Sequence, residues 1–150
     1  MKTKFDIQGY EYDWLAVDSD GHVGLFSTAG GGFAPQPFLA DIEAADIAIE
    51  RILALAPTSA VACNVVLAEG LINTWRLVGE RGIFAFDSDS SGGPYKLIAK
   101  PRRPVLISEL PMDIRVVASR VSFAALRFFG STVIAAEQLV AEKASGRCSG

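Results

Sequence analysis

Cysteine, histidine and long apolar runs are all scarce in this sequence. Its two cysteines, Cys63 and Cys148, stand far apart, which argues against a disulfide framework and suits a reducing cytoplasm. One histidine cannot supply a histidine-rich zinc site, and neither cysteine has a CxxC neighbour. No apolar run reaches the roughly 18 residues of a membrane-spanning helix, and none follows the basic start of the chain. We therefore expect a cytoplasmic protein with neither a membrane segment nor a secretory signal.

The amino-acid composition is that of an ordinary globular domain. Half of the 150 residues are hydrophobic and 21% are charged, which is enough apolar side chain for one packed core. The last residues are small and polar, which is typical of a disordered end. We expect a single α+β domain over residues 1–145 and a disordered tail over 146–150.

Turn signals and alternating apolar residues predict a sheet of short antiparallel strands. The stretch "YDWLAVDSDGHVGLFST" (12–28) indicates two strands around an Asp-Gly turn, with Trp14 and Ala16 on one face and Leu15 and Val17 on the other. Residues 58–82 are ambiguous: they could hold a strand at about 61–67 and then helical turns that carry Asn73, Trp75 and Arg76. Further strands are expected where short apolar runs lie between turns, at 83–87, 95–100, 104–107 and 121–129.

The strongest helical pattern covers about residues 36–56. Its apolar residues recur at helical spacing and form one stripe, which consists of Phe38, Ile42, Ala45, Ile49 and Ile52. Pro57 then ends the pattern. We expect this main amphipathic helix to pack on one face of the sheet. Shorter helices are expected near the C-terminus, at about 110–121 and 135–144.

Charge is divided unevenly along the chain. Residues 1–55 carry nine acids and three bases and net −6, whereas the remaining 95 residues net +3. The outward face of the predicted helix holds Asp41, Glu43, Asp46 and Glu50, and an acidic face of this kind favours a basic protein partner. The alternative is that the two halves neutralise one another in the fold. An isoelectric point near 5.1 argues against nucleic-acid binding, despite the "KPRRP" turn.

Aspartate, glycine and the only histidine gather in the stretch 16–33, and a similar aspartate-rich turn follows later. Neither has the spacing of an EF-hand loop, which needs carboxylates at positions 1 and 12. Placing Gly21 at position 6 puts Ala16 and Ser27 at those places, and the second turn has Ile98 at position 12. We expect the aspartates to accept hydrogen bonds from the turn backbone, and we expect no tightly bound metal.

The same stretch lacks the motifs of a phosphate site or of a nucleophile. Neither G-x-G-x-x-G nor G-x-x-x-x-G-K-[ST] is present, and acids at 41 and 43 would repel a phosphate, so no cofactor is expected. His22 could act as a general base beside an aspartate, but no G-x-S-x-G motif accompanies it. The glycines are expected to form a mobile loop or to admit another surface close to the backbone. The alternative ligand or catalytic site comprises Asp18, Asp20, His22, Gly30, Gly31, Gly32, Asp87 and Asp89.

Two stretches together resemble a family of small, uncharacterised bacterial proteins. The family pattern is a D-W-x-A-V-D-x-x-G-H-x-G-x-F hairpin followed by a G-x-F-x-[FY]-D segment that ends in G-G-P-Y. The matching positions are Asp13, Trp14, Ala16, Val17, Asp18, Gly21, His22, Gly24, Phe26, Gly82, Phe84, Phe86, Asp87, Gly92, Gly93, Pro94 and Tyr95. The resemblance implies no activity. In size and acidity the chain is similar to immunity proteins, which block a bacterial toxin by binding it.

Three functions follow as hypotheses. The sequence favours a non-catalytic protein-binding domain, of the immunity type, because an acidic helix is present and a complete catalytic constellation is absent. The second hypothesis is a small enzyme or ligand-binding protein that uses the alternative site. The third is a structural domain, such as a homodimer.

Overall fold

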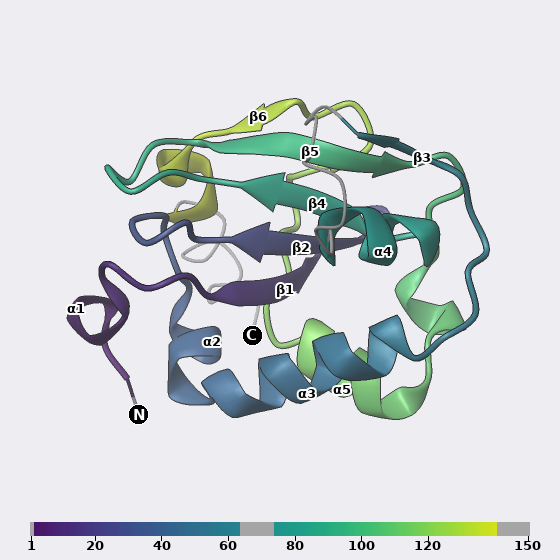
Figure 1. Ribbon diagram of the computed structural model, residues 1–150, viewed down its shortest axis with the longest axis horizontal. Helices are drawn as coiled ribbons and strands as arrows, with labels where there is room; N and C mark the ends of the chain where they lie inside the picture. The colour runs from purple at the N-terminus through teal and green to yellow at the C-terminus, as the bar shows by residue number, and fades with distance from the viewer. Residues whose placement is uncertain (1, 64–73, 141–150) are drawn as a thin grey trace.

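The computed structural model describes residues 2–63 and 74–140, which combine a six-stranded sheet with short helices (Figure 1). The strands are β1 (Asp13–Val17), β2 (Val23–Ser27), β3 (Val61–Cys63), β4 (Phe84–Asp87), β5 (Tyr95–Pro101) and β6 (Val133–Ile134). The helices are α1 (Lys4–Ile7), α2 (Gln36–Ala40), α3 (Ile42–Leu53), α4 (Thr74–Glu80), the 3-10 helix η1 (Ile107–Glu109) and α5 (Met112–Ala118). Residues 136–140 are also helical. This mixture confirms the α+β class and the short helices near the C-terminus.

The β1–β2 hairpin forms where the Asp-Gly turn predicts it. Gly21 takes a φ of 83°, a backbone conformation that glycine adopts without strain. Trp14 and Ala16 join one core cluster, and Leu15 and Val17 join the other, as the alternation predicts. Both faces of this hairpin are therefore buried.

The expectation of a wholly antiparallel sheet is wrong at one pair of strands. The order is β1-β2-β4-β5-β3, with β6 also paired to β5, and β2 runs parallel to β4. All the other strand pairs are antiparallel. A parallel pair needs a long crossover, and here the crossover is the whole chain between residues 28 and 83. Side-chain alternation within each strand carries no information about this direction.

The expected helix over 36–56 is two helices, with a break at Asp41. Asp41 leaves the helical region (φ −154°, ψ 74°), and its carboxylate accepts a hydrogen bond from the backbone N–H of Ala44. An aspartate that caps a helix in this way competes with continued helix. The second helix, α3, ends at Leu53, before Pro57. It still carries its apolar stripe against β1, as expected of the main helix (Figure 1).

Two other predicted strands, 104–107 and 121–129, are wrong. Near Leu106 the chain makes a single bridge to the β1–β2 turn and then enters η1. No ladder forms because Pro104 has no N–H, and the N–H groups of Val105 and Ile107 donate to carbonyls in loops. Residues 121–129 bury Val121, Phe123, Leu126 and Phe128, but they make only one bridge, to the edge of β1. The short apolar run over 121–129 indicated burial, and the strand expected from it is wrong.

The ambiguous stretch 58–82 contains a short strand and a helix. The strand expected at 61–67 is β3 as far as Cys63, and Trp75 and Arg76 lie in α4. The rest of that strand, Asn73, and the expected tail at 146–150 lie outside the described residues.

Helices cover the sheet unevenly. In Figure 1, α3 and α5 lie together beside β1. The helix α4 packs against β4 and β5. No described helix is long and apolar enough to cross a membrane.

Candidate functional site

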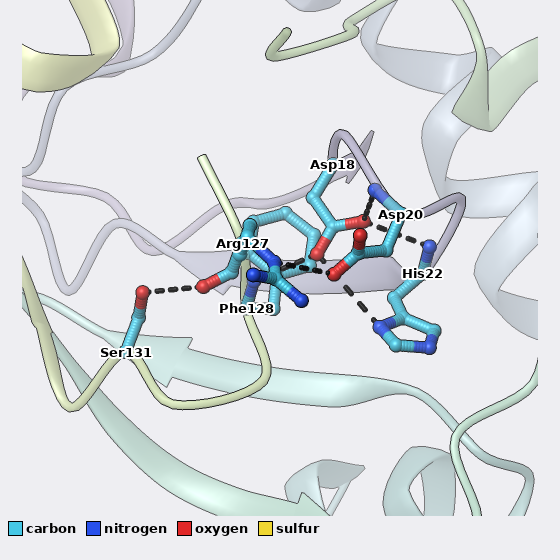
Figure 2. A network of polar contacts seen from close by, with 6 residues as sticks. All are labelled: Asp18, Asp20, His22, Arg127, Phe128 and Ser131. Carbon is cyan, nitrogen blue, oxygen red and sulfur yellow. Dashed lines mark hydrogen bonds and ion pairs between the residues drawn. The ribbon is translucent and has the colours of Figure 1, made fainter. Parts of the chain in front are cut away.

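Asp18 organises the turn between β1 and β2. Its Oδ1 accepts the backbone N–H groups of Asp20 and His22, both at 2.9 Å, and its Oδ2 accepts that of Phe128 at 2.7 Å (Figure 2). The side chain has no exposed surface. These bonds come from the turn itself and from the backbone of Phe128, so Asp18 both shapes the turn and attaches the distant 127–130 segment to it.

Asp20 and His22 extend from the same turn toward Asp18. The Nε of Arg127 donates to Asp20 Oδ2 at 2.8 Å, and this hydrogen bond, followed by the charges of Asp20 and Asp18, raises the pKa of Arg127. The His22 ring lies near Phe84, with ring centroids 5.7 Å apart, and its Nδ1 is buried without a hydrogen-bond partner. One potential ligand atom from each of Asp18, Asp20 and His22 lies within 4.8 Å of the others.

The glycine loop is not part of this cluster. It follows the far end of β2, about 17 Å away for a five-residue strand. There it packs on the aspartate-rich turn 88–93: a Cβ atom added to Gly31 would lie 2.3 Å from the carbonyl oxygen of Ser90. The expected close approach to the glycine backbone is therefore made by another loop of the same chain. The alternative site thus divides between the two ends of the sheet.

Asp87 and Asp89 also fall in different surroundings from His22. Asp89 accepts hydrogen bonds from the backbone N–H groups of Ser91 and Gly93, both at 2.9 Å, and from the Ser91 hydroxyl, and these bonds lower its pKa. Its role is to hold its own turn, as the sequence predicts. Asp87 lies at the end of β4 and takes part in a different cluster.

That cluster is a polar row across three strands, and sequence reasoning missed it. Ser27 is paired with Asp13 on one side and with Asp87 on the other, so the three side chains share a face. The Ser27 hydroxyl donates to Asp13 at 2.5 Å and accepts the indole N–H of Trp75 at 2.9 Å. The hairpin register could have indicated the Asp13–Ser27 pair, but Asp87 and Trp75 arrive through the parallel β2–β4 pairing.

Burial raises the pKa of both carboxyls in the row. For Asp13, desolvation is the largest cause, and the charges of Glu11 and Asp46 add to it against the Ser27 hydrogen bond. For Asp87, desolvation followed by the Glu11 charge raises the pKa to about 6. A serine hydroxyl between two carboxyls of raised pKa is a typical surrounding for proton transfer, although the Ser27 hydroxyl is already engaged by Asp13 and Trp75.

The acids that the sequence assigned to partner binding lie on exposed positions of α3 and its cap. Asp41 caps the helix and pairs with Arg120 at 3.4 Å, so part of its charge is compensated. Glu43, Asp46 and Glu50 make no ion pair in the part of the chain that the structure describes. Desolvation, followed by the charges of Glu50 and Glu43, raises the pKa of Asp46.

A groove of about 760 Å³ borders the glycine loop. Its walls include Gly30–Gly32, Phe33 and Leu39, and two cations, Lys2 and Lys4. No described carboxylate lines it, so Asp41 and Glu43 lie outside it. The loop amides of Gly31 and Gly32 donate to the carbonyl of Thr28, and they are not available to cradle a phosphate.

No known family model matches this chain, and comparisons with curated proteins and with solved structures found no match either.

Proposed function

We propose that this protein is a non-catalytic domain that binds a basic protein partner through an acidic surface, in the manner of an immunity protein that inhibits a bacterial toxin. The observation that supports this most directly is a series of mutually repelling carboxylates that runs from α3 past the start of β1 to the end of β4. The acidic surface comprises Glu11, Asp13, Glu43, Asp46, Glu50 and Asp87.

These acids act on one another across three elements. The charges of Glu50 and Glu43 raise the pKa of Asp46 on α3. The charge of Asp46 in turn raises the pKa of Asp13 on β1. Glu11 raises the pKa of Asp13 and of Asp87, which links the start of β1 to the end of β4. Like charges held together cost folding stability, and a cationic partner relieves that repulsion while being steered by the field. The electrostatics therefore favour a basic ligand.

An apolar side chain lies within the charged part of α3. Ile47 is 53% exposed, and it is within one helical turn of Glu43, Asp46 and Glu50. Interfaces commonly combine a buried apolar anchor with a charged rim. We assign Ile47 the role of the anchor and the acids the role of the rim.

The test is charge reversal combined with a change of salt. The double variant Asp46→Lys/Glu50→Lys should fold normally, because both residues are exposed. Its association with a partner recovered from the native host should slow by about tenfold or more, the lower range of electrostatic steering. Raising salt should slow the unmodified protein in the same way, because screening shortens the reach of the field.

A matched pair of single variants controls for net charge. Glu50→Lys and Glu137→Lys make the same change at two exposed glutamates, of which only Glu50 belongs to the acidic surface. Only Glu50→Lys should slow association. If the two variants associate with the partner at equal rates, or if no partner is recovered, then the acidic surface faces solvent and binds no partner.

The second candidate function is binding of a small anionic ligand, and the groove beside the glycine loop favours it. Grooves of a few hundred Å³ with apolar walls and a few charged groups are common ligand sites, and parallel strands often end at one. Lys2 and Lys4 supply the charge. An anionic apolar dye should bind in this groove. Its affinity should fall in the double variant Lys2→Gln/Lys4→Gln but not in the control Lys96→Gln. An equal loss of affinity in both variants would show that the dye does not bind in the groove.

A further inference from the structure

Three potential metal ligands, Asp18, Asp20 and His22, converge beside the β1–β2 turn. The bonds from Asp20, His22 and Phe128 occupy both lone pairs of Asp18 Oδ1 and one lone pair of Oδ2. Oδ2 keeps one lone pair and lies 3.9 Å from His22 Nδ1. Nδ1 is buried and has no hydrogen-bond partner, which is an unusual state for a buried polar atom.

From this convergence we propose that Asp18, Asp20 and His22 form a binding site for a divalent transition-metal ion, Zn²⁺ in particular. The three potential ligand atoms lie within 4.8 Å of one another. A metal ion would occupy the orphaned Nδ1 lone pair and neutralise the charge of the two carboxylates. The proposal does not depend on partner binding, because the acidic surface begins at the opposite end of β1.

The donor set selects zinc over calcium and magnesium. Imidazole nitrogen is a ligand for zinc and its neighbours in the first transition row, whereas calcium and magnesium prefer oxygen alone. One histidine and two carboxylates provide three protein ligands, which is the number found in open zinc sites with a fourth position for water. The EF-hand spacing that the sequence lacks is not required for this geometry.

Movements of at most about 1.5 Å between ligand atoms close the site, because the three atoms lie within 4.8 Å of one another. Zinc bonds of 2.0–2.1 Å in a tetrahedron place ligand atoms about 3.3 Å apart. The His22 Nδ1–Asp18 Oδ2 distance of 3.9 Å must therefore shorten by about 0.6 Å on the same geometry. The three backbone bonds to Asp18 orient its carboxylate beforehand, as partners of metal ligands generally do.

Arg127 competes with the metal for Asp20. Its guanidinium donates to Asp20 Oδ2 at 2.8 Å, but the Arg127 side chain is 69% exposed. Exposed ion pairs are weak and easily exchanged. If Arg127 competes with the metal, removing its charge should tighten metal binding. If the Arg127–Asp20 ion pair only holds the turn in place, removing the charge should loosen the turn and not tighten metal binding.

Isothermal titration with Zn²⁺ tests the site. All variants carry Cys63→Ser and Cys148→Ser, so that no thiolate binds the metal. We expect one zinc per chain with a dissociation constant below about 10 μM, the weak limit of sensor-type metal sites. His22→Gln and Asp20→Asn should each weaken binding by about tenfold or more. Arg127→Gln should tighten it by about two- to fivefold, which is the strength of an exposed ion pair.

The matched control is Asp89→Asn, which makes the same change as Asp20→Asn in the other aspartate turn. It should leave zinc binding unchanged. No binding by the parent protein, or equal binding by the parent and Asp20→Asn, overturns the proposal.

A second measurement needs no variant at the site. Because the chain has one histidine, its ring nitrogens give unambiguous signals in a ¹H–¹⁵N NMR spectrum. Zinc should shift the Nδ1 resonance of His22 strongly and the Nε2 resonance less. An unchanged ring spectrum at saturating zinc overturns the proposal even if zinc binds elsewhere.

Discussion

Replacing Asp87 with asparagine should stabilise the protein at neutral pH. Asp87 ends β4 in the polar row, where desolvation first and the charge of Glu11 next raise its pKa from 3.8 to about 6. Its charged form is therefore less favourable in the folded state than in the unfolded chain. Asparagine has nearly the same shape and carries no charge, so the substitution removes this penalty.

The magnitude and its pH dependence follow from the shift. Two pKa units correspond to roughly 3 kcal/mol, and solvent screening of a partly exposed carboxylate reduces this to about 1–2 kcal/mol. Between about pH 4 and pH 6 the folded state holds a proton that the unfolded state has lost, so the stability contribution of Asp87 falls as pH rises. The advantage of Asp87→Asn should be near zero at about pH 4 and reach its maximum above about pH 6.

Urea unfolding of both proteins across this range is the assay. At neutral pH the variant should unfold about 3–6 °C higher in a thermal scan as well. Asp89→Asn is the opposite control, because hydrogen bonds lower the pKa of Asp89 and its charged form supports the turn. A difference between Asp87→Asn and the parent that does not change with pH would refute the electrostatic reasoning.

Three further substitutions test the packing. Ile49→Asp puts an unpaired charge on the buried stripe of α3 and should cost more than about 3 kcal/mol, measured by urea unfolding. Gly31→Ala places a methyl group 2.3 Å from the Ser90 carbonyl oxygen and should cost about 1–3 kcal/mol in the same assay, and an unchanged midpoint would mean that the two loops are apart. Tyr95→Phe removes the hydroxyl that accepts the indole N–H of Trp14 at 3.1 Å, and it should lower stability by about 1–3 kcal/mol with a change in tryptophan fluorescence.

Features encoded within a few neighbouring residues could be predicted from the sequence. The Asp-Gly turn specified the β1–β2 hairpin, because glycine supplies the backbone angle that the turn needs. The stripe that includes Ile49 specified the buried face of α3. The hydrogen bonds of Asp18 and Asp89 to their own turns were expected for the same local reason.

Local patterns misled where two short-range preferences competed. The apolar stripe continues through Asp41, so periodicity alone predicted one helix, while the capping bond to Ala44 divides it. The apolar run over 121–129 indicated burial, but a ladder also needs a partner strand along its length, and β1 offers only one bridge. Periodicity measures burial, and it does not count hydrogen-bond partners.

Only the tertiary structure decided which distant residues meet. The parallel pairing of β2 with β4 brings Asp87 to Ser27 across sixty residues of chain, and no local signal encodes that register. The same holds for the polar groups at the turn, where Phe128 and Arg127 reach Asp18 and Asp20 from the far end of the sequence. Residue types determined what each group can do, and strand direction and register determined which groups lie close enough to act together.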